Sequence, residues 1–99
     1  MQCIRIDPVG TLSVENVSYA DLQSELGEAL SDWGVPSFPE IISVSALDDS
    51  NMLPNGPATR IMGGPYCGPV YLLSRHYKSL SQDEINCLLD YLEGESEDD

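Results

Sequence analysis

The chain opens with two segments that alternate apolar and polar residues, Cys3-Ile4-Arg5-Ile6 and Thr11-Leu12-Ser13-Val14-Glu15-Asn16-Val17. A period of two is typical of β-strands that bury one face. Between these segments, Asp7-Pro8-Val9-Gly10 combines residue types that favour a turn. We therefore expect an antiparallel β-hairpin at the start of the chain.

A helix is expected directly after this hairpin. The Ser18 hydroxyl can act as the N-cap, and Asp21 stands at the third helical position, where its carboxylate can meet free backbone amides. The helix should therefore begin at Tyr19.

The apolar residues that follow recur at helical spacing and end before Gly-Val-Pro at 34–36. They are Leu22, Leu26, Ala29, Leu30 and Trp33. We expect the helix to continue to Trp33. Its weak point is Gly27, because glycine in a helix interior costs roughly 1 kcal/mol relative to alanine.

Further elements are expected along the rest of the chain. Residues 40–46 and 70–73 read as strands, residues 57–62 as a short helix, and Ser81 with Glu84 forms a capping box that begins a closing helix. This helix should end near Gly94, with residues 95–99 as a disordered acidic tail. The order ββαββα predicts a single α+β domain over residues 1–94. It would contain a small, mostly antiparallel four-stranded sheet with two main helices packed on it and the short extra helix.

The first helix would carry a stripe of acidic residues. Asp21, Glu25, Glu28 and Asp32 would lie within an arc of roughly 60° and rise by roughly 5–6 Å from one to the next. That spacing is close to the spacing of phosphates along a nucleic-acid strand. Because no lysine or arginine occurs from residue 6 to residue 59, nothing nearby in sequence offsets their repulsion. A solvated helix face is the alternative interpretation.

The whole chain is strongly acidic, with 17 Asp and Glu against 4 Lys and Arg among 99 residues and a formal charge of −13. Direct binding to nucleic acid or to an anionic membrane is therefore disfavoured, and the expected partner is basic. Proteins from high-salt cytoplasm have a similar composition, so an acidic halophilic protein of housekeeping role remains an alternative.

The cysteines and the hydropathy pattern point to a cytoplasmic protein. Cys3, Cys67 and Cys87 are odd in number and include no C-x-x-C pair, so neither a disulfide framework nor a zinc site is expected. No apolar run in the sequence is long enough for a membrane-spanning helix, and the N-terminus reads as a strand instead of a signal peptide. We expect no catalytic residues, no metal and no cofactor.

Several short motifs occur together in this chain: Leu53-Pro54-Asn55, Ala58-Thr59, Gly63-Gly64-Pro65 and Gly68-Pro69-Val70, the capped helix after Leu80-Ser81, and the opening Cys3-Ile4-Arg5-Ile6-Asp7-Pro8. In these motifs the chain resembles a family of short phage and plasmid proteins known only as a domain of unknown function. This resemblance implies a mobile-element origin and supplies no catalytic residues. Small acidic phage proteins are frequently anti-CRISPR or anti-restriction inhibitors, including DNA mimics.

These observations predict a non-enzymatic inhibitor that binds a basic nucleic-acid-handling surface of a host defence complex in the host cytoplasm. The stripe residues would contact the partner, together with Asp83, Asp90 and Glu93 of the closing helix and with Tyr66, if its ring is exposed. A homodimer through an open sheet edge would double the acidic surface.

The alternative is a module that sequesters a nucleotide signal. Its site would be the loop at 63–69, with Arg60 and the backbone of Gly63, Gly64 and Gly68 around a phosphate. The loop matches neither common phosphate-binding motif, and its two prolines remove amide donors.

Overall fold

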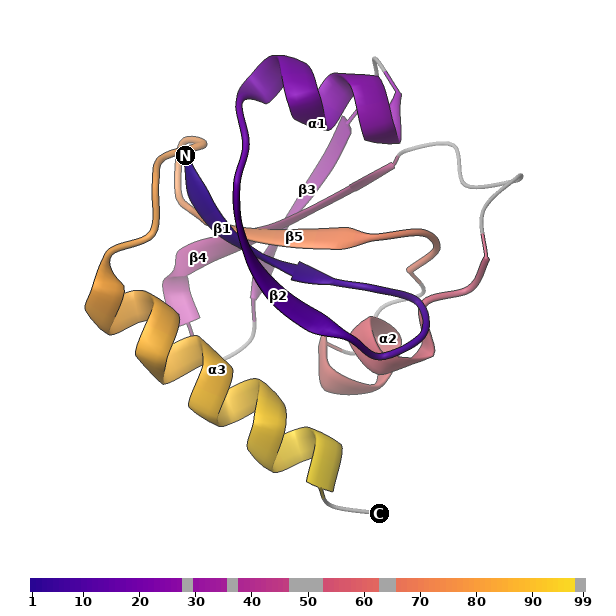
Figure 1. Cartoon of the computed structure of the whole chain (residues 1–99), viewed down its shortest axis with the longest axis vertical. Helices are drawn as coiled ribbons and strands as arrows, with labels where there is room; N and C mark the ends of the chain where they lie inside the picture. Colours follow the sequence, from indigo (N-terminus) through magenta and orange to yellow (C-terminus); the bar gives the residue numbers. More distant parts are fainter. Residues whose placement is uncertain (28–29, 36–37, 47–52, 63–65, 98–99) are drawn as a thin grey trace.

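The computed structural model describes residues 1–27, 30–35, 38–46, 53–62 and 66–97, without the side chains of 30, 31, 60–62 and 93–97. The elements are β1 (Gln2–Ile6), β2 (Leu12–Asn16), α1 (Tyr19–Leu26), β3 (Leu30–Val35), β4 (Phe38–Ala46), α2 (Gly56–Met62), β5 (Val70–Ser74) and α3 (Gln82–Glu97). The described strands form one antiparallel sheet in the order β2-β1-β5-β4-β3 (Figure 1). The α+β class and the antiparallel sheet are confirmed, but the sheet has five strands where four were predicted.

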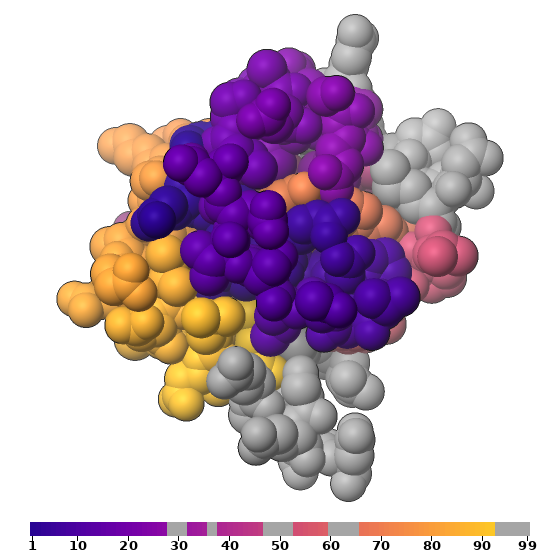
Figure 2. All heavy atoms as spheres, viewed as in Figure 1, coloured from indigo at the N-terminus to yellow at the C-terminus, as the bar shows by residue number. Residues whose placement is uncertain are grey.

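The opening hairpin forms as predicted. Strands β1 and β2 pair from Gln2 opposite Asn16 to Ile6 opposite Leu12. In the turn, the amide of Gly10 donates to the carbonyl of Asp7 at 2.9 Å, and Gly10 adopts a φ of 98° that suits glycine. In the space-filling view, the hairpin lies at the surface between α1 and α3 (Figure 2).

Helix α1 begins at Tyr19 as predicted but ends at Leu26, so the expected continuation to Trp33 is wrong. Its capping box is complete: the Asp21 amide donates to Ser18 Oγ at 3.1 Å, and the Ser18 amide donates to Asp21 Oδ2 at 2.9 Å. Gly27 ends the helix with a φ of 101°, outside the helical region. The glycine expected in the helix interior is therefore its C-cap.

The residues expected to extend that helix form strand β3 instead. Leu30 pairs with Ala46 and Trp33 with Ser43, and the register shifts between Gly34 and Val35. Pairing with β4 gives the backbone of this segment hydrogen-bond partners in another strand. These pairings outweigh the helical spacing of its apolar residues, which Gly27 already interrupts. Strand β3 forms one edge of the sheet and β2 the other.

The sheet buries both of its faces. On one face, Ile4, Leu72 and Ile41 pack with α2 and α3 in a cluster that includes Ala58 and Leu88. On the other, a separate cluster joins the sheet to α1, formed by Cys3, Val44, Ala46, Tyr71 and Leu73 with Leu22 and Leu26. Because side chains alternate along a strand, β1 and β5 contribute to both clusters.

Helix α3 begins with the predicted capping box, in which the Ser81 amide donates to Glu84 Oε1 at 2.9 Å and the Glu84 amide to Ser81 Oγ at 3.2 Å. It continues to Glu97, beyond the end expected near Gly94. The expected tail at 95–99 is thus helical over 95–97, and residues 98–99 lie outside the described residues. Once a helix is nucleated, each further residue adds a hydrogen bond, which carries it through one glycine. No helix in the described ranges is long and apolar enough to cross a membrane.

Candidate functional site

The four acids of the predicted stripe do not share one helix. Asp21 and Glu25 lie exposed on α1, Asp32 lies exposed on β3, and Glu28 falls outside the described residues. Because α1 ends at Leu26, the phosphate-like spacing along one helix face is not formed. Each of the three described acids also contacts a partner within the same chain.

Asp21 serves the N-terminus of α1. Its carboxylate accepts a hydrogen bond from the Ser18 amide, and this bond, followed by that from the Ser18 side chain, lowers the pKa of Asp21. The carboxylate therefore stays ionised and remains exposed at the helix end.

Glu25 is paired with an arginine of the sheet. Arg5 Nη2 lies 3.1 Å from Glu25 Oε1, Arg5 Nη1 binds Asp7, and Arg5 Nε donates to the Tyr71 hydroxyl at 3.1 Å. The guanidinium also lies 5.9 Å from the centre of the Tyr71 ring. Burial, followed by the neighbouring Glu25, raises the pKa of Tyr71 to about 12. No cation close in sequence offsets the charge of Glu25, but Arg5 of β1, distant along the chain, does so in the folded protein.

Asp32 borders a hollow of about 320 Å³ beside the turn that follows β5. The Tyr77 hydroxyl donates to Asp32 Oδ2 at 3.1 Å, and burial, followed by Asp32, raises the pKa of Tyr77 to about 12. Arg75 and His76 line the same hollow. His76 and Tyr77 have left-handed φ values of 64° and 57°, an uncommon backbone conformation for non-glycine residues. No sequence motif indicated this hollow, because it joins β3 to a turn that lies far away along the chain.

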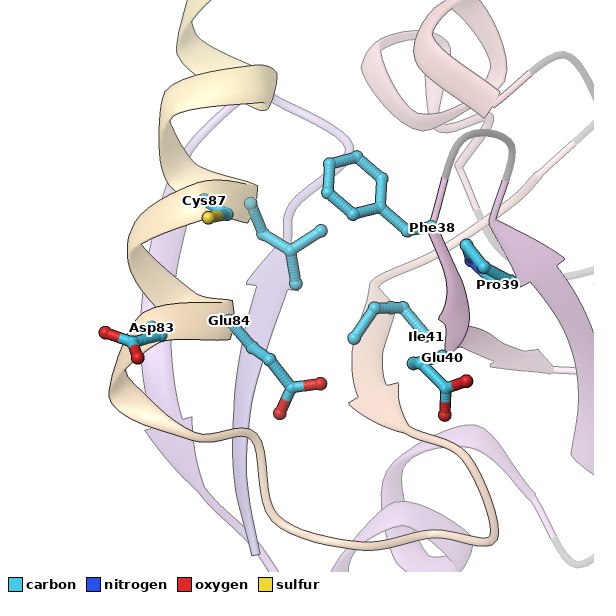
Figure 3. Close-up of a pocket in the computed structure, with 8 residues that line it drawn as sticks. Phe38, Pro39, Glu40, Ile41, Asp83, Glu84 and Cys87 are labelled. Atoms are coloured by element: carbon cyan, nitrogen blue, oxygen red, sulfur yellow. The ribbon is translucent and has the colours of Figure 1, made fainter.

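An apolar concavity lies between β4 and α3, and we call it the β4–α3 groove (Figure 3). Its volume is about 290 Å³, and it is lined by Phe38, Pro39, Glu40 and Ile41 from the strand and by Asp83, Glu84, Cys87 and Leu88 from the helix. Ile41 and Leu88 are almost fully buried and form its floor. The Phe38 ring packs edge-on against Tyr91, with 5.2 Å between ring centres.

Carboxylates border this apolar floor. Figure 3 shows Glu84 extending from α3 toward β4, with Glu40 on the opposite side, whereas Asp83 points away along the outer margin. Glu40 lies 3.9 Å from Arg75, and both side chains are at least half exposed. Asp83 was predicted as a partner contact, but the groove itself was not. Its two sides are distant in sequence, and only the folded sheet brings them together.

The other predicted contacts on α3 are placed unequally. Asp90 is exposed, about one helical turn beyond Cys87, and does not line the groove. Glu93 belongs to α3, but its side chain is not among those that the structure describes.

Tyr66 is a core residue, so the exposed ring on which its role as an interface anchor depended is not present. Its exposed fraction is 8%, and its hydroxyl lies 3.1 Å from Ser43 Oγ on β4. The buried serine gives the phenol a polar partner inside the protein, so the ring can join the core that it helps to fill.

The loop proposed to hold a phosphate is organised around a buried asparagine. Asn55 Nδ2 donates to the carbonyls of Ile6 at 2.9 Å and Gly68 at 2.8 Å, and Asn55 Oδ1 accepts from the Ala58 amide at 3.1 Å. Asn55 itself is completely buried. This side chain therefore ties the loop to β1 and to the start of α2.

Two of the loop amides that the structure describes are already used. The Gly68 amide donates to the carbonyl of Leu53 at 2.7 Å, and the Tyr66 amide donates to Thr59 Oγ1 at 3.0 Å. Neither is available to a phosphate. Gly63, Gly64 and the Arg60 side chain lie outside the described residues.

No group of three or more His, Cys, Asp or Glu residues able to hold a metal ion occurs in the described part of the chain. The fold and the groove define a small acidic α+β protein with an apolar concavity bordered by carboxylates. Comparisons with protein-family models, curated proteins and solved structures found no match. The resemblance to short phage and plasmid proteins therefore stays a prediction.

Proposed function

We propose that the chain is a non-enzymatic inhibitor from a phage or another mobile element that acts in the host cytoplasm. It would bind a basic nucleic-acid-handling surface of a host defence complex and exclude DNA or RNA from it, as anti-CRISPR and anti-restriction proteins do. The net charge of −13 supports a basic partner, because charge of this sign attracts a basic surface and repels nucleic acid.

One observation carries this proposal: the arginines whose side chains are described already face acids of the same chain. Arg5 contacts Asp7 and Glu25, and Arg75 lies 3.9 Å from Glu40. These guanidinium groups are therefore engaged within the fold. The surplus of carboxylates remains to face a partner.

The acids that support binding are spread over the molecule instead of forming one helical stripe. Asp21 on α1, Asp32 on β3, and Asp83 and Asp90 on α3 are all exposed. Such dispersed charge speeds association with a basic surface and loses strength as salt screens it. The apolar floor of the β4–α3 groove would supply the part of the affinity that salt does not remove.

Pull-down from host lysate with the tagged protein, with and without competing DNA, tests the proposal. We expect capture of a nucleic-acid-binding complex that DNA displaces, and inhibition of DNA or RNA binding by the purified complex at a stoichiometric ratio. Absence of a protein partner, or a partner indifferent to DNA, would contradict it. Loss of folding at low salt would favour the halophilic alternative.

A pair of matched variants tests the role of charge in that inhibition. Changing Asp32, Asp83 and Asp90 together to asparagine should weaken inhibition, whereas changing the same three to glutamate keeps their charge and should preserve it. Equal inhibition by both triple variants would contradict a role for these carboxylates.

A further inference from the structure

We propose that the β4–α3 groove receives one apolar side chain, flanked by lysine or arginine residues, from a segment of the protein partner. This inference rests on the proposed function and specifies where the basic partner is held. Two features of the groove support it: the volume of the groove over its apolar floor, and the negative charge of the residues at its border (Figure 3).

The size and lining of the groove suit a side chain. Its volume of about 290 Å³ lies at the lower end of the pockets that hold small molecules, which span roughly 300–1,000 Å³. Phe38, Ile41 and Leu88 present carbon atoms from two different elements. An aromatic or branched aliphatic side chain entering between them would bury apolar surface on both of its sides.

The border selects basic flanking residues. Glu84 and Glu40 lie on opposite sides of the apolar floor, Asp83 lies at its outer margin with its carboxylate pointing away, and Arg75 contacts Glu40 (Figure 3). One Glu84 oxygen accepts from the Ser81 amide as part of the helix cap, which fixes that carboxylate at the groove. The border therefore carries a net negative charge, and a nucleic-acid strand or an acidic segment would be repelled.

Glu40 can bind a cation of the partner, because its contact with Arg75 is long and exposed. The two side chains are 74% and 50% exposed and lie 3.9 Å apart, at the long limit of an ion pair. Exposed pairs of this kind contribute little stability. A lysine or arginine of the partner can therefore bind Glu40 without breaking a strong internal interaction.

The peptide Lys-Lys-Phe-Lys-Lys is a direct probe of the groove, followed through backbone amide shifts in NMR spectra. We expect saturable shifts centred on residues 38–41 and 83–88. The charge-matched peptide Lys-Lys-Gly-Lys-Lys should bind more weakly, because it lacks the apolar anchor, and Gln-Gln-Phe-Gln-Gln should also bind more weakly, because it lacks the cations.

Two pairs of variants separate the groove from general charge attraction. Glu40→Gln alters the border, and Glu15→Gln alters an exposed acid that does not line the groove. Each variant removes one negative charge, from −13 to −12. We expect the first to weaken peptide binding roughly fivefold and the second to change it by less than about twofold.

A second pair of variants tests the groove by filling it, while the buried residues of its floor stay unchanged. Cys87→Phe places a ring at an exposed position that lines the groove, and Asn86→Phe places the same ring at the neighbouring exposed position that does not. We expect only Cys87→Phe to abolish the localised shifts, with both variants folded as judged by the remaining spectrum.

Shifts dispersed over all the acids, with equal weakening in both charge-matched variants, would overturn the groove inference and leave the proposed function standing. Localised binding of the peptide together with no basic partner in lysate would support the groove and contradict the proposed function. The two failures are therefore distinguishable, because the peptide measurement needs no host protein.

Discussion

Arg5 of β1 and Glu25 of α1 form an ion pair with 3.1 Å between Nη2 and Oε1, and this pair links the hairpin to the helix that follows it. The same guanidinium binds Asp7 and the Tyr71 hydroxyl, so one side chain connects β1, α1 and β5. This ion pair changes the role that is assigned to Glu25 on α1. Glu25 holds the fold together, and its neutralisation should not relieve a repulsion.

Replacement of Arg5 by alanine should lower the free energy of unfolding by about 1–2 kcal/mol, because it removes hydrogen bonds between charged groups and the packing of the side-chain stem. Arg75→Ala is the matched control. It makes the same change of charge at a more exposed site and should change stability by less than about 0.5 kcal/mol. Urea denaturation measures both, and equal losses would contradict the role assigned to Arg5.

Gly27→Ala should destabilise the protein by about 1–2 kcal/mol. Its φ of 101° is strained for any residue with a Cβ, and no atom lies within 4 Å of the added carbon, so the cost is one of backbone conformation. Gly34→Ala adds the same carbon in open space without a left-handed φ, and should cost less than about 0.5 kcal/mol. Thermal unfolding of the two variants gives the comparison, and similar melting temperatures would contradict the cap.

Asn55→Ala should cost about 3 kcal/mol or more, because it leaves two carbonyls and one amide without their buried partner. Asn86→Ala, at an exposed position of α3, is the control and should change stability by less than about 0.5 kcal/mol. Denaturant unfolding checks this prediction. A small effect at Asn55 would mean that the loop at 53–68 does not depend on this side chain.

Alkaline pH should destabilise the fold. Burial raises the pKa of Cys3 from 9.0 to about 11, and the pKa values of Tyr71 and Tyr77 rise from 10.0 to about 12. In each case the folded state holds the proton more tightly than the unfolded state does. The contribution of these three groups to the free energy of unfolding is therefore fully present below pH 9 and is lost between pH 9 and pH 12.

Phenolate absorbance during a pH titration, combined with urea denaturation at each pH, measures this loss. Tyr77→Phe should retain the packing and reduce the loss between pH 10 and pH 12. A stability that stays constant up to pH 12 would contradict the pKa shifts.

Local signals in the sequence located most of the elements correctly. Ser18 with Asp21 and Ser81 with Glu84 both form the capping boxes that their spacing predicts, because such hydrogen bonds join positions within one helical turn. The turn at 7–10 is local in the same way. In contrast, Leu30 and Trp33 were expected to continue the first helix, because their spacing of three suits a helix face. Their segment instead forms β3 by pairing with β4, whose position the local pattern does not contain.

The candidate site was less predictable for the same reason. Asp83 could be named as an exposed acid, but the floor beside it includes Phe38 and Ile41, which come from a much earlier part of the chain. Tyr66 was expected to contact the partner only if its ring is exposed, and nothing local shows that Ser43 lies beside its hydroxyl in the core. The sequence pattern does not show which distant segments of the chain lie close together in the folded protein.

The order of the strands has a consequence for how the chain acquires its fold. The β1–β2 and β3–β4 hairpins each pair neighbours in sequence, whereas β5 lies between them and pairs with β1 and β4. During synthesis, the two hairpins can form early, but they remain separate until the segment at 70–74 leaves the ribosome. Insertion of this central strand closes the long loop between β1 and β5, which is the entropically expensive and slow event in assembling the sheet.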